Sequence, residues 1–320
     1  MPRIILDTDP GIDDALALFL ALASPEVQRE AITTVSGNVH VDLTTRNALA
    51  LLELAGSPGI PVARGCDRPL VRQSVTADYV HGRNGLGGIE LPEPKLQPSS
   101  QHAVDLIIEK ILAAPGEITL VPIGPLTNIA LALRKEPHIA QQVREVVIMG
   151  GALLVPGNVT AAAEFNIYAD PHAAHMVLHA GWPIRLVSLD VTTKALLQRK
   201  QVQQLASIGS PVTRFIQQVV DSYLETFGRS RGLTAFQMHD PLCLAAAFQP
   251  DLITWEPAYV DVELAGTLTS GETVAYFERP ADIDPSLERG HSANVLASVG
   301  VDAERFIAFY TDRIRSTFTL

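Results

Sequence analysis

Short apolar segments alternate with amphipathic segments along the first 190 residues, and this alternation limits the fold more than any other feature of the sequence. Six segments have the β-branched and apolar composition of buried strands: 3–7, 31–37, 60–65, 118–124, 145–151 and 184–190. Five segments between them repeat apolar residues at helical spacing: 13–24, 44–56, 102–114, 125–136 and 170–181. The pattern predicts a Rossmann-like, doubly wound α/β fold, with a mainly parallel sheet and helices on both faces.

The pattern changes after residue 200. Helical spacing continues over residues 200–227 and 238–248, and residues 259–278 are typical of two strands around a Ser-Gly turn. We find no long linker and no internal repeat, so we expect one domain over residues 1–320 with a C-terminal helical and β-hairpin elaboration. Residues 64–101 form the longest stretch without a regular pattern, and loops of this length are often functional.

Charge and composition exclude several classes of partner. The formal net charge is −11 and Lys and Arg form no stripe, so we expect no nucleic-acid partner. The apolar run at residues 15–23 is too short to span a bilayer, so we expect no membrane association. Cys66 and Cys243 have neither C-x-x-C nor Cys/His metal spacing. With no signal peptide evident, we expect a cytoplasmic protein.

The segment "DTDPGIDDA" (7–15) holds four carboxylates directly after the first predicted strand. Like charges this close disfavour joint ionisation, so a positive partner is expected. An EF-hand loop is excluded because Leu18 stands where that loop needs Glu. Three interpretations remain open from these residues: a strand-end D-x-D phosphatase, a solvated helix cap, and a calcium site in which Asp9 and Asp14 converge on one ion.

Glycine, Asp and Asn also follow the other predicted strands. Gly37 and Asn38, Gly124, Gly150 with Gly151, and Asp190 all occur at predicted carboxyl ends. Open α/β sheets bind ligands at these ends, so this distribution predicts a ligand site there.

Four more motifs accompany the acidic segment: "TTVSGN" (33–38), "VPIGPLTNIA" (121–130), "MGG…GNVTAAAEFN" (149–166) and "MHDP" (238–241). Together the five closely resemble the inosine–uridine nucleoside hydrolase family, and especially its non-specific ribonucleoside hydrolases. They follow the family's order, with "HGRNGLGG" (81–88) in its expected place. The resemblance implies one bound Ca²⁺ beneath a ribose.

The resemblance also implies roles for individual residues. Asp9, Asp14 and Asp240 match the carboxylate ligands of the ion, and Ile123 matches a backbone carbonyl ligand. The remaining matches are sugar contacts: Asp13, Asn38 and Asn166 at the 2′- and 3′-hydroxyls, Asn158 and Glu164 at the 5′-hydroxyl, and Met149 and Phe165 as pocket walls.

Histidine and aromatic residues complete the expected site. His239 matches a contact to the leaving base, and Tyr223 matches an aromatic near the base in purine-competent members. Phe227 stands where some of these members have Tyr, which leaves the base preference open. His81 either contacts the base or caps its loop, and the glycines of residues 82–88 suggest a lid. One helix carries further histidines at metal-compatible spacing, which we interpret as ordinary helix residues: His172, His175 and His179.

The resemblance implies hydrolysis of the N-glycosidic bond of ribonucleosides to ribose and a free purine or pyrimidine base, in nucleoside salvage or catabolism. Asp9 is then the expected general base for the attacking water, and His239 the expected proton donor to the base. A non-catalytic nucleoside sensor and a phosphatase are the alternatives. The family also suggests a homodimer or homotetramer.

Overall fold

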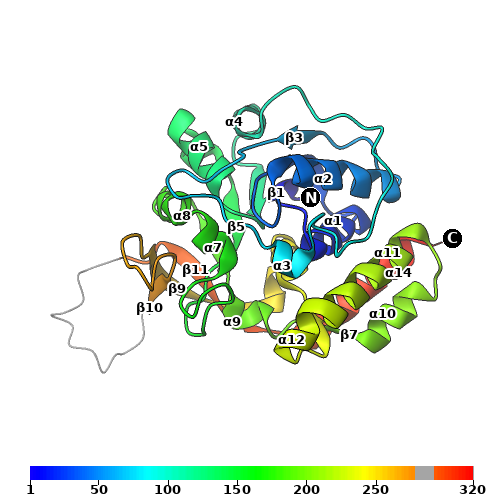
Figure 1. Cartoon of the computed structure of the whole chain (residues 1–320). Coiled ribbons are helices and arrows are strands. Elements are labelled where there is room, and N and C mark those ends of the chain that lie inside the picture. Colours follow the sequence, from blue (N-terminus) through cyan, green and yellow to red (C-terminus); the bar gives the residue numbers. More distant parts are fainter. Residues whose placement is uncertain (278–291, 320) are drawn as a thin grey trace.

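A computed structural model describes residues 1–277 and 292–319. A nine-stranded sheet runs through its centre in the order β10-β9-β11-β6-β5-β4-β1-β2-β3 (Figure 1). The strands are β1 (Arg3–Thr8), β2 (Gln28–Thr34), β3 (Val62–Arg64), β4 (Ile118–Pro122), β5 (Glu145–Met149), β6 (Ile184–Val187), β9 (Ile253–Val262), β10 (Thr273–Phe277) and β11 (Val295–Val301).

The six predicted strands form the parallel part of this sheet. β1 pairs in parallel with β2 and β4. On one side β3 pairs in parallel with β2, and on the other side β5 pairs with β4 and β6 with β5. The predicted α/β class is therefore confirmed. Five strands, β2 to β6, end earlier than predicted, and Gly37, Gly124 and Gly150 lie in the loops beyond three of them. Those loops form the edge of the sheet at which ligands bind in open α/β folds.

Helices cover both faces of the sheet. One face packs against α4 (Ala103–Ala113), α5 (Thr127–Lys135) and α8 (Pro171–Leu178) (Figure 1). The other face packs against α1 (Ile12–Ala23), α2 (Val41–Leu54), α11 (Pro211–Tyr223), α13 (His239–Ala246) and α14 (Ala303–Thr317). The chain thus buries one apolar core on each side of the sheet.

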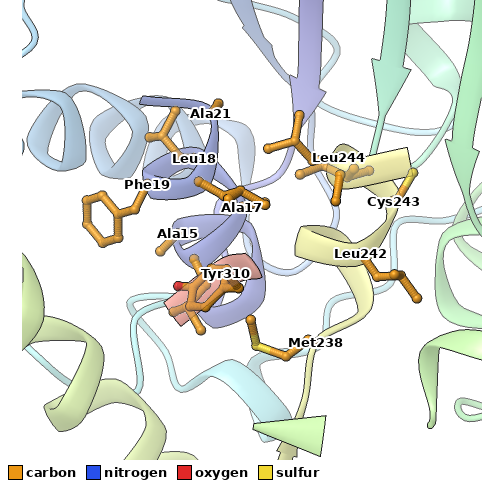
Figure 2. Close-up of a cluster of buried hydrophobic side chains, with 14 of the residues drawn as sticks. Ala15, Ala17, Leu18, Phe19, Ala21, Met238, Leu242, Cys243, Leu244 and Tyr310 are labelled. Carbon is orange, nitrogen blue, oxygen red and sulfur yellow. The ribbon is translucent and has the colours of Figure 1, made fainter. Parts of the chain in front are cut away.

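Helix α1 is enclosed by its neighbours. Ten of its 12 residues are buried, as expected for a helix that is apolar on nearly every side. Figure 2 shows α1 beside α13, with Leu242 and Leu244 of α13 and Tyr310 of α14 in the same buried cluster. Only three residues separate the end of β1 from the start of α1. The packing of α1 therefore fixes the N-terminus of this helix at the carboxyl edge of the sheet.

The C-terminal part contains the predicted hairpin and one strand of the main sheet, β11, that was not predicted. β9 and β10 pair antiparallel, and Gly271 in the turn has a φ of +86°, which favours glycine. Glu278, the last residue of the predicted hairpin, lies outside the described residues. β11 enters the sheet between β9 and β6, antiparallel to the first and parallel to the second. The elaboration therefore extends the main sheet.

Short elements complete the described chain: α3 (Asp78–His81), α6 (Ile139–Gln142), α7 (Phe165–Ala169), α9 (Leu189–Thr192), β7 (Leu196–Gln198), α10 (Arg199–Ala206), the π-helix η1 (Leu224–Gly228), α12 (Arg229–Arg231), β8 (Ala235–Gln237) and the 3₁₀-helix η2 (Pro250–Leu252). β7 and β8 form a separate two-stranded antiparallel sheet. Over residues 1–277 and 292–319, no helix combines the length and apolarity needed to cross a membrane.

Candidate active site

A cavity of about 360 Å³ lies at the carboxyl ends of the parallel strands. Its volume is in the range of small-molecule sites. Twelve of the 14 predicted site residues line it: Asp13, Asn38, His81, Ile123, Met149, Asn158, Glu164, Phe165, Asn166, Tyr223, His239 and Asp240. The other two, Asp9 and Asp14, are 0% and 1% exposed and lie behind this wall. The structure therefore brings the predicted residues of eight separate segments to one place.

Three carboxylates meet at the floor of this cavity. Asp13 and Asp14 begin α1, Asp240 begins α13, and one oxygen of each lies within 4.8 Å of the others. The carboxyl groups of Asp13 and Asp240 approach each other closely, and two buried carboxyl groups in contact require a shared proton or a cation. Burial, followed by repulsion from the neighbouring carboxylates, raises the pKa of both Asp13 and Asp240. The packing of α1 against α13 therefore creates an acidic group that is unfavourable without positive charge.

Asp14 is held by hydrogen bonds on all sides. Its Oδ1 accepts from the Thr8 hydroxyl at 2.6 Å and the Asp9 N–H at 3.1 Å. Its Oδ2 accepts from the Gly11 N–H and from Asn38 Nδ2, both at 2.9 Å. These four bonds fix the orientation of the carboxylate, and a cation that binds Asp14 must displace at least one of them. In this arrangement Asp14 stabilises the turn between β1 and α1 and ties it to Asn38.

Asp9 is buried between the ends of three strands. Its Oδ2 accepts from the Asn38 N–H at 2.6 Å, whereas its Oδ1 has no hydrogen-bond partner within the described part of the chain. A Cβ at Gly37 would lie 2.1 Å from Oδ2, and one at Gly124 would lie 2.4 Å from Oδ1, so both strand ends require glycine. Burial, and then the charge of Asp14, raises the pKa of Asp9.

The four aspartates fit a hard cation. The acidic group offers carboxylate oxygens without Cys or His, which is the donor set that Ca²⁺ and Mg²⁺ prefer. A cation here would stabilise the ionised carboxylates that burial disfavours, and the unpartnered Oδ1 of Asp9 would gain a partner. The three carboxylates whose oxygens lie within 4.8 Å of one another include Asp13, which the resemblance assigns to the ribose. The other two, Asp14 and Asp240, are expected ligands of the ion.

The amide of Asn166 joins two strand ends across the cavity. Its Nδ2 donates to the Ile123 carbonyl at 2.9 Å and to the Met149 carbonyl at 3.2 Å. β4 and β5 are thereby held together at the wall. Ile123, Met149 and Asn166 therefore lie together in the wall of the cavity.

Glu164 holds the start of α7. Its Oε1 accepts from the Asn166 N–H at 2.9 Å, and its Oε2 accepts from the N–H groups of Gly151 at 3.1 Å and Ile167 at 3.2 Å. Burial raises the pKa of Glu164. Asn158 accepts from the Phe165 N–H at 2.9 Å, so both predicted sugar contacts also shape this corner of the wall.

His81 caps a helix as well as lining the cavity. Its Nδ1 accepts from the Ile12 N–H at 3.0 Å, one of the first amides of α1. Because Nδ1 accepts, the ring proton of the neutral form lies on Nε2. Burial lowers the pKa of His81, which favours this neutral form. His81 therefore caps α1, whereas the sequence predicted that it caps its own loop or contacts the base.

The glycine-rich segment around His81 is tied to its surroundings. Asn84 Oδ1 accepts from the N–H groups of Leu86 and Gly88, each at 3.0 Å. Ser222 donates its hydroxyl to the Gly87 carbonyl at 2.7 Å. The backbone of this segment thus has a defined position in the free protein, and its expected role as a lid stays a prediction.

His239 lines the cavity above Asp240. Its Nδ1 lies 2.8 Å from the hydroxyl of Thr192, a fully buried residue at the end of α9. Burial, and then the nearby His81, lowers the pKa of His239 to about 4. A neutral His239 that accepts from Thr192 presents its remaining ring N–H on Nε2 as a donor.

Aromatic residues surround the other end of the cavity. Tyr223 contacts Phe227 and Phe236, with ring centroids 5.5 Å and 4.8 Å apart. Phe227 also contacts Tyr79 at 6.3 Å and lies under the Arg231 guanidinium at 5.3 Å. Sequence analysis missed Tyr79, Arg231 and Phe236. Tyr79 lies two residues before "HGRNGLGG" and Phe236 two residues before "MHDP", and this proximity could have identified both from the sequence.

The first carboxylate of the acidic segment is structural. Asp7 Oδ1 accepts from the Thr33 hydroxyl at 2.5 Å and from Asn128 Nδ2 at 2.8 Å. Burial raises the pKa of Asp7 to about 7. Asn128, within the motif "VPIGPLTNIA", therefore supports the carboxyl end of β1.

Comparison with known proteins decides between the remaining interpretations. The family model of the inosine-uridine preferring nucleoside hydrolases matches residues 4–308. The chain belongs to this family. The new nucleoside hydrolase is 42% identical to the inosine-uridine preferring nucleoside hydrolase of Crithidia fasciculata over 317 residues, 98% of each chain. It is 40% identical to the pyrimidine-specific ribonucleoside hydrolase RihA of Salmonella arizonae over 313 residues, again 98% of each chain.

Solved structures give the same result. The nucleoside hydrolase superposes on the purine-preferring ribonucleoside hydrolase from Gardnerella vaginalis with a TM-score of 0.91 and 34% identity, covering 98% of each chain. A plant nucleoside hydrolase, the PpNRh1 enzyme, gives a TM-score of 0.92 and 36% identity over 98% of this chain and 99% of that one. The predicted family and fold are confirmed. The protein is an enzyme that hydrolyses ribonucleosides to ribose and base.

Proposed function

We propose that this hydrolase requires one Ca²⁺ per chain and accepts both purine and pyrimidine ribonucleosides, in nucleoside salvage or catabolism. The buried carboxylates beneath a nucleoside-sized cavity carry the proposal, because they disfavour their own ionisation unless a hard cation joins them. Mg²⁺ demands near-ideal octahedral geometry, whereas irregularly placed ligands suit Ca²⁺.

Asp9, Asp14, Asp240 and the Ile123 carbonyl would hold the ion. The unpartnered Asp9 Oδ1 and the Asp13–Asp240 contact support a cation among these groups. When bound, Ca²⁺ supplies positive charge that lowers the pKa of water and attracts hydroxyl oxygens.

The cavity wall would bind and orient the ribose. We assign Asp13, Asn38 and Asn166 to the 2′- and 3′-hydroxyls, because their polar atoms line the floor beside the acidic group. Asn158 and Glu164 are assigned to the 5′-hydroxyl, with Met149 and Phe165 as apolar walls. Fixing the sugar in this way places C1′ for attack and favours reaction by orientation.

Two proton movements complete the reaction. Water attacks C1′, the C1′–N bond breaks, and the proton of the water passes to Asp9 Oδ1 as positive charge develops on the ribose. His239 in its protonated form would give its Nε2 proton to the departing base, which leaves neutral, and the ring would return to the neutral form that accepts from Thr192. The hydrogen bond between Thr192 and His239 Nδ1 supports this assignment because it leaves Nε2 as the donor.

The aromatic end of the cavity would hold the base. Tyr223, Phe227 and Tyr79 offer ring surfaces, and stacking on such surfaces is tolerant of base identity because every base has a π-face. His81 contributes its Nε2–H near the same place. These contacts support acceptance of both base classes.

The decisive experiment measures free base and reducing sugar released from inosine and uridine by the Ca²⁺-loaded protein. We expect both substrates to be cleaved, 2′-deoxy analogues to be strongly rejected, and activity to disappear after verified removal of the ion. Full activity without Ca²⁺ would contradict the metal assignment. Binding without turnover would identify a sensor, and phosphate release from phosphomonoesters would identify a phosphatase.

Three further expectations complete the proposal. Residues 1–320 form one domain, the protein works in the cytoplasm, and it assembles as a homodimer or homotetramer. Unfolding followed by two spectroscopic probes tests the first, because a single domain gives coincident transitions. Cell fractionation and sedimentation test the other two.

A further inference from the structure

A second group of possible metal ligands lies outside the catalytic cavity. His175 on α8 and its neighbour one turn later, His179, meet Asp261 of β9, and one ligand atom of each lies within 4.8 Å of the others. None of the three lines the cavity. Figure 1 shows α8 beside the end of the sheet that contains β9, β10 and β11. The group therefore joins a helix to a strand 80 residues away in sequence.

The distances within the group are short. His175 Nδ1 lies 2.7 Å from Asp261 Oδ1, and His179 Nε2 lies 3.8 Å from Asp261 Oδ2. The two imidazole rings stand side by side with centroids 4.5 Å apart. The three side chains are 39%, 32% and 34% exposed, so an ion can reach them from solvent without a change in fold.

The ring of His179 is already oriented as metal-binding histidines usually are. Its Nδ1 lies 2.8 Å from the His175 carbonyl oxygen, and a carbonyl can only accept, so Nδ1 carries the proton. In the neutral ring Nε2 then carries the lone pair and faces Asp261. A histidine ligand typically donates its other N–H to a backbone carbonyl or carboxylate, which fixes the tautomer.

We propose that His175, His179 and Asp261 form a second metal site, which binds a borderline transition-metal ion of the Zn²⁺ class. Two imidazoles and one carboxylate suit Zn²⁺, Co²⁺, Ni²⁺ or Cu²⁺, whereas Ca²⁺ avoids nitrogen ligands. The two clusters of this enzyme therefore select different ions.

The observed geometry is close to what such an ion requires. Ligand bonds of about 2.0–2.1 Å in a tetrahedral site place ligand atoms about 3.3 Å apart. The His175–Asp261 contact must open slightly and the His179–Asp261 contact must close slightly, which side-chain rotations on a fixed helix and strand provide. Three protein ligands leave the fourth position to water.

The Tyr259 hydroxyl adds to this environment. It lies 3.3 Å from both His179 Nε2 and Asp261 Oδ2, so it is placed to hydrogen bond to a bound carboxylate. Its ring contacts His179 edge to face, with centroids 5.8 Å apart. Tyr259 thus limits the rotation of both ligands and helps to hold them in position.

Titration of the full-length protein with Co²⁺ tests the site. The protein is first saturated with Ca²⁺, so that the aspartates of the cavity are occupied, and visible absorption of four-coordinate cobalt reports binding. We expect saturation near one Co²⁺ per chain, displacement of cobalt by Zn²⁺, and a higher Tm in the presence of Zn²⁺. Absence of the cobalt spectrum in the wild-type protein would overturn the proposal.

Variants locate the bound ion. His179→Ala and Asp261→Asn should each abolish the cobalt spectrum and the Zn²⁺-dependent rise in Tm. His138→Ala is the matched control, because His138 also pairs with a surface carboxylate, Glu136, at 2.8 Å but belongs to no group of three possible ligands within residues 1–277 and 292–319. Far-UV circular dichroism establishes that each variant is folded. Unchanged cobalt binding in folded His179→Ala and Asp261→Asn proteins would show that the ion binds elsewhere.

Discussion

The two ligand clusters of this enzyme are built in opposite ways. The cluster in the cavity contains buried carboxylates at the N-termini of α1 and α13, and burial raises the pKa of Asp13 and Asp240. The cluster on α8 and β9 combines two histidines with one carboxylate and remains about one-third exposed. Burial without a counter-charge makes the first cluster dependent on a cation, whereas the second is a stable His–Asp pair even when no ion is bound.

The difference shows how a fold can keep two metal chemistries apart. In the proposed arrangement, oxygen donors at the carboxyl edge of the sheet would select a hard ion beneath the substrate. Nitrogen donors beside α8 would select a softer ion away from the cavity. Each variant below changes residues of one cluster only, so that its effect on activity or stability can be compared with the effect of a change in the other cluster.

The largest effect is expected at Asp9. Asp9→Asn removes the proposed base while keeping the side-chain shape between Gly37 and Gly124, and we expect kcat to fall about 10³-fold. Steady-state release of base from inosine measures this loss. Asp42→Asn, a change at an exposed carboxylate on α2, serves as control. A fully active Asp9→Asn enzyme would refute the base assignment. Co²⁺ binding at α8 should be the same in both variants.

A smaller and substrate-dependent effect is expected at His239. His239→Ala should lower kcat on inosine by about a hundredfold, which is typical of a lost proton donor. Uridine should lose less, because uracil lacks N7 and must spread its charge over carbonyl oxygens. Ratios of kcat to wild type on the two substrates measure the difference. Equal losses would make His239 a general pocket residue, and no loss would assign proton donation to another group.

Thr192 should act through His239. Thr192→Val removes the hydroxyl that bonds to Nδ1, and the loss of a hydrogen bond of about 1 kcal/mol predicts a five- to tenfold lower kcat with little change in KM. Thr192→Ser should restore the rate because it restores the hydroxyl. If Thr192→Val lowers the rate equally in a His239→Ala background, the two residues act independently.

The smallest effect is expected in the second cluster without metal. His175→Ala removes a partly exposed His–Asp pair, so the free energy of unfolding should fall by at most about 1 kcal/mol. Urea denaturation in the presence of a chelator measures it. A loss of several kcal/mol would indicate that the pair is a structural link between α8 and β9 and would weaken the contrast with the cavity.

The sequence predicted the parallel part of the fold because periodicity is a local signal. Segments 3–7 and 118–124 have the composition of buried strands whatever surrounds them, and both became central strands. β11 was missed, because its place between β9 and β6 depends on partners far away in the chain. Its short run 295–301 includes Gly300 and has no strong strand pattern.

The sequence predicted those site residues that lie within family motifs. Asp9, Asn38 and Asn166 lie in such motifs, and their coming together could be expected. Contacts that depend on packing were not foreseen, such as the cap that His81 provides for α1 and the tilted ring contact between Tyr79 and Phe227. The contact between His175 and Asp261 joins residues 86 positions apart, and only the fold reveals it.

The enclosure of α1 has a consequence for how activity is lost. The amides of Asp9, Gly11 and Ile12 are bonded to Asp14 and His81 at the tip of a helix that is buried on nearly every side. Such groups exchange their hydrogens with solvent only when the whole core opens. The proposed catalytic carboxylate Asp9 and its neighbour Asp14 therefore keep their positions as long as this core stays folded. Heat and denaturant should therefore abolish catalysis and native structure in a single step, with no long-lived inactive form that keeps an intact core.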